Sequence, residues 1–244
     1  MGGTGLYVHA LSQALQQAGH DIHCVAPGGP GLRVRTAEHD GIKGHLIHGR
    51  PALTWRGAWT QRGTQRRWTR LLTKLQPDIV HIHHLSGLPI GLAEATRDAG
   101  VPLAMTLHDY WLPCHRGQLI TRTGASCDGP TPTGCAQCID APQTQRRVAD
   151  AQARIDAAKA ALQAADVLWS PSHDLAKRMT RMGLRTPQHC PLPLVRPMPP
   201  PGATSSGPVR FLFASTIIPT KGAHILLEAF RRLAVDAQLT LAGP

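Results

Sequence analysis

The stretch Leu103–Cys138 reads LAMTLHDYWLPCHRGQLITRTGASCDGPTPTGCAQC. It begins with apolar residues that predict a buried strand over Pro102–Leu107, and His108 and Asp109 follow where that strand would leave its sheet. In open α/β sheets, ligands bind at the carboxyl ends of the strands. The sequence therefore predicts a binding site around His108 and Asp109.

Strand-like and helix-like segments alternate on both sides of this stretch. The other predicted strands are Asp21–Ala26, a weaker one over Gly44–His48, Asp78–His83 and Val167–Ser170. The predicted helices are Leu6–Ala18, Ala58–Leu75, Leu88–Ala99, Gln143–Ala165 and one that Ser172 caps and that runs to Met182. Pro27–Gly31 is predicted to be a loop. This alternation predicts an α/β fold with a Rossmann-like parallel sheet covered on both faces.

The domain boundaries follow from changes in composition. Residues 1–186 form the predicted first domain, and residues 187–208 form a Pro-rich linker. Residues 209–244 begin a second Rossmann-like lobe, with strands at Val209–Ala214 and Gln238–Ala242 around a helix at Ala223–Leu233. This second lobe is shorter than the roughly 50 residues that a domain needs, so we expect it to be truncated. The N-terminal glycines open a helix with no strand before them, so we expect the first strand to be missing too.

The composition points to a soluble, basic protein with an anionic partner. Lys and Arg number 26 against 15 Asp and Glu, which gives a net charge of +11. No window approaches the length of a membrane span, and no secretory signal is evident, so we expect a cytoplasmic location. The basic residues cluster at Arg56, Arg62, Arg66, Arg67, Arg70 and Lys74, and again at Lys177, Arg178, Arg181 and Arg185.

Four of the six cysteines, Cys114, Cys127, Cys135 and Cys138, have the spacing C-x12-C-x7-C-x2-C. Four thiolates suit a closed tetrahedral zinc site that would shape the loop over residues 114–138. An iron–sulfur cluster could use the same ligands, and two disulfides are the alternative if the protein is exported.

Several segments in order resemble the N-terminal part of a retaining GT-B glycosyltransferase of family 4, followed by the start of its C-terminal domain. They are the glycine-rich start Gly2–His20, Pro77–Leu88 (PDIVHIHHLSGL), the TLHDYW turn with its cysteines, VLWSPSHDLAKRM before the linker, and Phe211–Phe230. The resemblance implies transfer of a sugar from a nucleotide diphosphate to an acceptor with retention of configuration.

The resemblance also assigns residues. It implies that Gly2, Gly3 and Gly5 let backbone N–H groups approach the donor diphosphate and that Lys221 contacts the donor phosphates. It places His108 beside the donor sugar, with Asp109 orienting His108 or facing the acceptor. The family usually has an arginine where this chain has Thr216 and a glycine where it has Ser215, which is a departure from the standard phosphate-binding loop.

On the acceptor side, the resemblance points to His84, with His83 beside it. We expect the acceptor to be a sugar or a lipid-linked sugar in envelope-polysaccharide or glycolipid synthesis, with peripheral contact to the inner face of an anionic membrane. No catalytic metal is expected. The carboxylates that hold the donor in the family would lie beyond Pro244, so we expect this chain to be inactive alone.

Two other functions remain open at this stage. A zinc-stabilised basic module could bind nucleic acid, although aromatic residues are only 4% of the chain and no recognition helix follows the C-x2-C pair. The chain could also be a truncated remnant without activity of its own.

Overall fold

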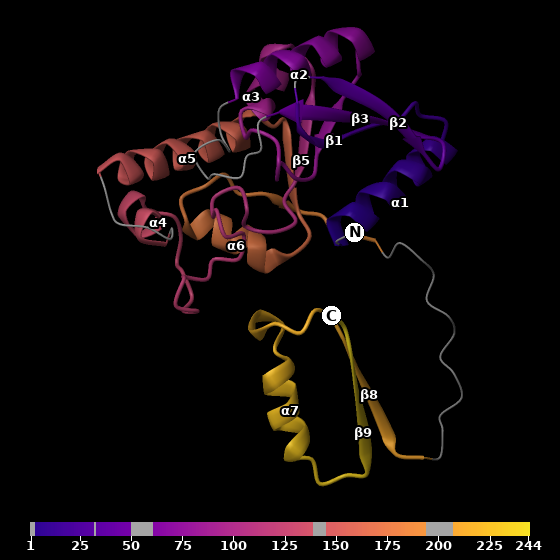
Figure 1. The fold of residues 1–244 in the computed structure, drawn as a ribbon, viewed down its shortest axis with the longest axis vertical. Helices are drawn as coiled ribbons and strands as arrows, with labels where there is room; N and C mark the ends of the chain where they lie inside the picture. Colours follow the sequence, from indigo (N-terminus) through magenta and orange to yellow (C-terminus); the bar gives the residue numbers. More distant parts are fainter. Residues whose placement is uncertain (1–2, 32, 50–60, 139–144, 194–206) are drawn as a thin grey trace. The chain divides into compact units, whose positions relative to one another are not determined.

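A computed structural model describes residues 3–31, 33–49, 61–138, 145–193 and 207–244 (Figure 1). The chain divides into two compact units, Met1–Val195 and Arg196–Pro244, each of which is described by itself. Gly2, the start of the predicted helix Ala58–Leu75 and most of the predicted linker lie outside the described residues.

The first unit begins with α1 (Gly3–Gln17) and a three-stranded sheet in the order β1-β3-β2. Strand β1 (His23–Pro30) pairs in parallel with β3 (Ile42–Gly49), and β2 (Val34–His39) pairs with β3 in an antiparallel hairpin. Asp40 and Gly41 close the hairpin with φ values of 50° and 75°. Positive φ at both central residues is the requirement of a type I′ turn.

The strand ends at which a ligand is predicted to bind belong to a second, four-stranded sheet. Its order is β4-β5-β6-β7 and all its pairings are parallel. The strands are β4 (Val80–Ile82), β5 (Leu103–Thr106), β6 (Val167–Ser170) and β7 (Gln188–His189). The helices are α2 (Arg62–Leu75), α3 (Leu92–Asp98), α4 (Pro132–Cys138), α5 (Gln145–Ala164) and α6 (His173–Arg181). The α/β class with a parallel sheet is therefore confirmed.

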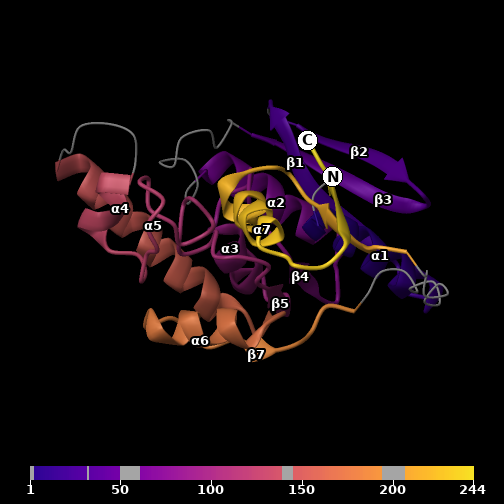
Figure 2. The same cartoon turned by 90° about the horizontal axis from the view of Figure 1, so that it is seen from below.

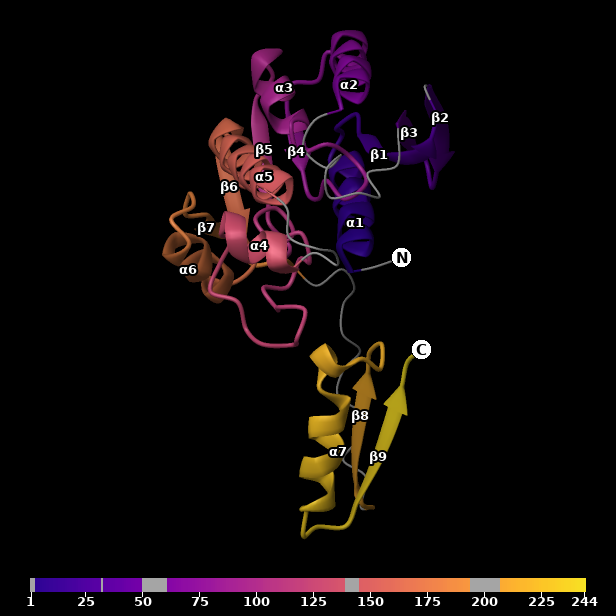
Figure 3. The ribbon, with the colours of Figure 1, turned by 60° about the vertical axis from the view of Figure 1, so that its left-hand side comes forward.

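Four of the helices form one continuous series, in which α2 contacts α3, α3 contacts α5 and α5 contacts α4. Helices α2 and α3 lie side by side (Figure 3), and α4 lies against α5 in the views of Figures 1 and 2. None of the helices in the described ranges is long and apolar enough to span a membrane.

The core of the first unit lies between β5 and these helices. Leu103, Ala104 and Met105 are each at most 2% exposed, as a central parallel strand requires. Trp68 of α2 is 6% exposed and donates its indole N–H to the Thr96 hydroxyl of α3 at 2.9 Å. This bond satisfies the one polar atom that the Trp68 side chain brings into the core.

Several predicted boundaries are correct and others are wrong. Ser172 caps α6, since its hydroxyl accepts from the Leu175 N–H at 3.1 Å, and β6 has the predicted bounds. The segment Pro27–Pro30, predicted as loop, continues β1 instead. It does so because β3 offers a parallel partner as far as Gly49, with a break in register between Pro27 and Pro30. Strands β2 and β7 were not predicted, and β7 occupies the start of the predicted linker because β6 offers it a parallel partner.

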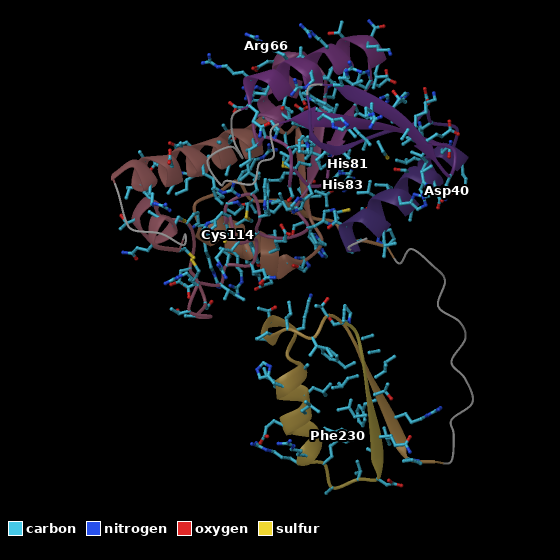
Figure 4. All side chains as sticks on the ribbon, viewed as in Figure 1. Asp40, Arg66, His81, His83, Cys114 and Phe230 are labelled. Carbon is cyan, nitrogen blue, oxygen red and sulfur yellow. The ribbon has the colours of Figure 1, made fainter. Side chains whose placement is uncertain are left out.

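The second unit is a small βαβ arrangement. Strands β8 (Val209–Ala214) and β9 (Ala237–Ala242) are parallel, and a 3-10 turn η2 (Pro219–Lys221) and α7 (Ala223–Arg231) connect them. Phe230 of α7 meets Phe211 of β8 edge to face, with ring centroids 6.0 Å apart (Figure 4). The predicted start of a second Rossmann-like lobe has this pattern of elements.

Candidate functional site

The carboxyl ends of β4 and β5 bring two pairs of polar residues together. Ile82 pairs with Met105, so the residues that follow each strand emerge at the same edge of the sheet. After β4 come His83 and His84, and after β5 come His108 and Asp109. These four side chains line a small pocket with Trp111 and apolar residues of both strands. This is where an open α/β sheet binds its ligand.

A hydrogen bond joins the two strands at this pocket. His83 Nδ1 lies 3.1 Å from His108 Nε2. Behind them, His81 Nε2 lies 2.8 Å from the Thr106 hydroxyl, and the rings of His81 and His83 have centroids 3.9 Å apart (Figure 4). The three imidazoles therefore form one connected group that runs from the buried strand to the pocket.

The three imidazoles are uncharged at neutral pH. Burial is the main cause, because it disfavours the charged form. It lowers the pKa of His81 to about 4 and that of His83 to about 3, with further lowering from neighbouring histidines. Burial and nearby His84 also lower the pKa of His108, against an opposing contribution from Asp109. With both rings neutral, the bond between His83 and His108 contains a single proton.

His84 and Asp109 form a second pair at the edge. The Ser86 backbone N–H donates to His84 Nδ1 at 2.9 Å, so the ring N–H of His84 is on Nε2, 3.4 Å from Asp109 Oδ2. Asp109 Oδ1 also accepts from the Trp111 N–H at 2.8 Å. Burial raises the pKa of Asp109, but these bonds and the nearby histidines outweigh burial and lower it overall. Asp109 thus contacts His84, whereas the sequence prediction offered His108 or the acceptor as its target.

Arg154 connects helix α5 to the turn that carries Asp109. Arg154 is 4% exposed, donates to the Trp111 carbonyl at 2.6 Å and lies with its guanidinium carbon 4.9 Å from the Trp111 ring centre. Burial lowers the pKa of Arg154 to about 10, so the side chain remains a cation. This cation–π contact and hydrogen bond hold the turn in place, and no sequence pattern indicates them.

Helix α1 brings Tyr7 to the same site. Gly3 and Gly5 lie in its first turn, and Tyr7, about one turn further on, has its ring centroid 5.7 Å from His83 and 5.5 Å from His108. A Cβ at Gly3 would meet nothing within 4 Å, so the space beside this backbone is open. Tyr7 was not among the predicted site residues, although its helical spacing from Gly3 could have indicated it.

Lys221 lies in the second unit, in η2 immediately after β8 and the loop that follows it. Gly222 comes next with φ of 78°, a left-handed conformation that favours glycine, and α7 begins after it. Lys221 therefore stands at the start of a helix after a strand, and its contact with donor phosphates stays a prediction.

The four-cysteine metal site receives no support from the structure. All six cysteines are free thiols, and within the described ranges no three His, Cys, Asp or Glu side chains are grouped so that they could hold a metal ion. Cys127 donates instead to the Gly129 carbonyl at 3.4 Å. Burial, with the nearby Cys114, Cys127 and Cys138, raises the pKa of Cys135, which favours the protonated thiol. The spacing brings the thiols into one region but not into a ligand set.

Comparisons with known proteins identify the family. The model of Glycosyltransferase Family 4 matches residues 1–189. The chain belongs to glycosyltransferase family 4. A comparison with curated proteins found no match.

Solved structures of the GT-B fold are similar to this family 4 chain. One is described as trehalose-6-phosphate from E. coli bound with UDP-2-fluoro glucose. It is 13% identical to this chain with a TM-score of 0.50, and the match covers 100% of this chain and 62% of the chain in that structure. Another comes from work on bisubstrate glycomimetics of trehalose-6-phosphate synthase. It is 14% identical to this chain with a TM-score of 0.48, and the match covers 99% of this chain and 61% of the chain in that structure. The chain thus spans about three fifths of the length of these structures.

The neutral histidines predict an acid-sensitive stability. A histidine whose pKa is lowered by folding takes up its proton more readily when unfolded, so stability is full above pH 6.5 and falls as the pH drops toward 4. Each such histidine contributes a slope of up to about 1.4 kcal/mol per pH unit. Urea unfolding between pH 7 and pH 4 should show this decline, and His83→Gln should make it shallower.

The matched control is Thr69→Ala, since Thr69 is an exposed residue without a titratable group. The control should leave the pH slope of the unfolding free energy unchanged. An equal slope for wild type and His83→Gln would contradict the assignment of a buried, neutral His83.

Proposed function

We propose that this chain provides the acceptor-side lobe and the first part of the donor lobe of a glycosyltransferase that moves a sugar from a nucleotide diphosphate to an acceptor, with retention of configuration. The observation that carries the proposal is the neutral His83–His108 pair beside Tyr7 of α1, at the carboxyl edge of a parallel sheet. Membership of family 4 supports the reaction class.

The charge changes of glycosyl transfer match this arrangement. In the transition state the sugar gains positive charge and the leaving diphosphate gains negative charge. A neutral His108 can hydrogen-bond a sugar hydroxyl without placing a second positive charge next to the developing cation. The free N–H groups at the start of α1, beside the open backbone of Gly3, can bind the diphosphate.

The remaining roles follow from position. Lys221 would add a point charge for the donor phosphates from the second unit. The fixed His84–Asp109 pair would contact a hydroxyl of the acceptor, which we propose to be a sugar or a lipid-linked sugar of envelope-polysaccharide or glycolipid synthesis. We place the reaction in the cytoplasm, because six free cysteines suit a reducing compartment. No step in this scheme needs a metal ion.

Nuclear magnetic resonance of the histidine side chains tests the proposal on the chain as it is. Titration with UDP-glucose, GDP-mannose and other nucleotide sugars should shift the imidazole resonances of His83 and His108 and leave that of His39 in place. Lys221→Gln should weaken the response if the second unit contributes to donor binding. If no nucleotide sugar moves the His108 resonance while the protein stays folded, the proposed donor site is wrong.

A further inference from the structure

Helix α2 exposes a row of arginines that the site does not use. Arg62, Arg66 and Arg70 are four residues apart and all exposed, so they share one side of the helix. Opposite them, Trp68, Leu71 and Leu72 are buried in the core. Figure 4 labels Arg66 on the outer side of α2, with its side chain pointing away from the sheet. We call the exposed side of α2 the arginine face.

The arginine face has no acidic partner within the described ranges. No ion pair is found there for Arg62, Arg66 or Arg70, whereas Arg97, Arg178 and Arg232 each have one. The sequence explains this, because residues 41–77 contain eight Lys and Arg and no Asp or Glu. A charged surface that the protein does not neutralise attracts an external polyanion.

The shape of the face favours a flat partner over a small ligand. Arg62, Arg66 and Arg70 border a shallow hollow whose other lining residues, Gln65, Thr69 and Thr73, come from the same helix. One convex helix cannot enclose a single phosphate, but its row of cations can lie along a surface that carries many. The three arginines are spaced along the helix axis at about 6 Å, the rise of four residues.

Nucleic acid suits the face less well. Proteins that bind single strands stack bases on exposed aromatic rings. The aromatic residue of α2 is Trp68, which is 6% exposed and bonded to Thr96. The exposed positions of α2 are occupied by arginine, lysine, threonine and glycine. We propose that the arginine face of α2 docks the protein on an anionic lipid bilayer through Arg62, Arg66 and Arg70.

Vesicle co-sedimentation with the full chain tests this docking surface. The wild-type chain should bind vesicles of phosphatidylcholine mixed with phosphatidylglycerol, fail to bind phosphatidylcholine alone, and dissociate as sodium chloride is added. The variant Arg62→Gln/Arg66→Gln/Arg70→Gln should bind roughly 100-fold more weakly, because each basic residue near an anionic surface contributes about five-fold. Glutamine is a good helix former, so α2 should persist, which circular dichroism checks.

Two matched variants separate a specific face from general charge. Arg62→Lys/Arg66→Lys/Arg70→Lys should keep most of the binding, because a lipid surface responds to charge. Lys177→Gln/Arg181→Gln/Arg231→Gln removes three exposed charges elsewhere and should bind like wild type. The proposal is overturned if this second variant loses as much binding as the glutamine triple variant, or if the lysine variant loses it.

A parallel gel shift with single-stranded RNA decides between partners. If the glutamine variant loses RNA binding and keeps vesicle binding, the face is a nucleic-acid surface and the lipid proposal is wrong. The vesicle assay contains no nucleotide sugar, so its result does not depend on glycosyl transfer. Vesicle binding that depends on the arginine face would favour a lipid-linked acceptor.

Discussion

In the complete glycosyltransferase that we propose, replacing His108 with alanine should slow the release of nucleoside diphosphate from a nucleotide sugar by about 100- to 1,000-fold, the usual effect of removing one preorganised polar group from a transition state. His108 is held by His83 at 3.1 Å and by the Tyr7 ring, so its ring has little freedom to turn away from the pocket. Its removal leaves the sugar without a positioned partner at the edge of β5. The measurement is the steady-state rate with saturating donor and acceptor.

His39→Ala is the control for this loss. His39 is also a histidine of the first unit, but it lies exposed on β2 and pairs with Asp40, outside the pocket lining. This variant should retain the wild-type rate. His83→Gln should give an intermediate rate, since glutamine can hydrogen-bond His108 but does not reproduce the ring contact with Tyr7. A His108→Ala protein that folds and keeps the full rate would show that the reaction takes place elsewhere.

Trp68→Ala should lower the free energy of unfolding by about 3–5 kcal/mol, as expected when a buried aromatic side chain is removed and leaves a cavity. Trp68 is 6% exposed and lies in the main core cluster between α2 and α3. Its indole also bonds Thr96, which is 0% exposed. Urea unfolding at pH 7 measures the loss.

Trp68→Phe separates packing from hydrogen bonding. In this variant the Thr96 hydroxyl still donates its proton to the Leu92 carbonyl at 2.7 Å. Trp68→Phe should therefore lower the free energy of unfolding by well under half of the decrease caused by Trp68→Ala. Thr69→Ala changes an exposed residue of the same helix and should stay within about 0.5 kcal/mol of wild type. A Trp68→Ala protein as stable as the Thr69→Ala control would mean that α2 does not depend on this contact.

The main features of the fold were predictable from local pattern. The apolar run before His108 correctly predicts a buried strand, because a central parallel strand has no polar face to interrupt it. Strand β2 has the sequence VRTAEH and was missed, because its residues are almost all exposed and only its pairing with β3 makes it a strand. The Pro-Gly segment at the end of β1 was misjudged for the same reason.

The candidate site could be predicted in position but not in its contacts. The end of the predicted strand indicates where His108 and Asp109 lie. Their partners follow β4, and no local sequence pattern predicts that β4 lies next to β5 in the sheet. Asp109 therefore proved to be the partner of His84. The low pKa values of His81 and His83 depend on burial by distant segments, which the sequence does not display. Cysteine spacing gives the separation of the thiols along the chain and not their arrangement in space. Within the described residues, the thiols at 114, 127, 135 and 138 do not form a metal-binding group, and Cys127 donates to a backbone carbonyl.

The Arg154–Trp111 stack ties α5 to the turn that carries Asp109. A helix that shifts slightly along the sheet would pull the Trp111 carbonyl with it, and Asp109 would move because it accepts a bond from the same residue. Under the proposed contact between Asp109 and the acceptor, changes in the alanine-rich helix alone can alter acceptor preference. Homologues that exchange the arginine should exchange the tryptophan as well, and libraries meant to alter acceptor choice gain by including both positions.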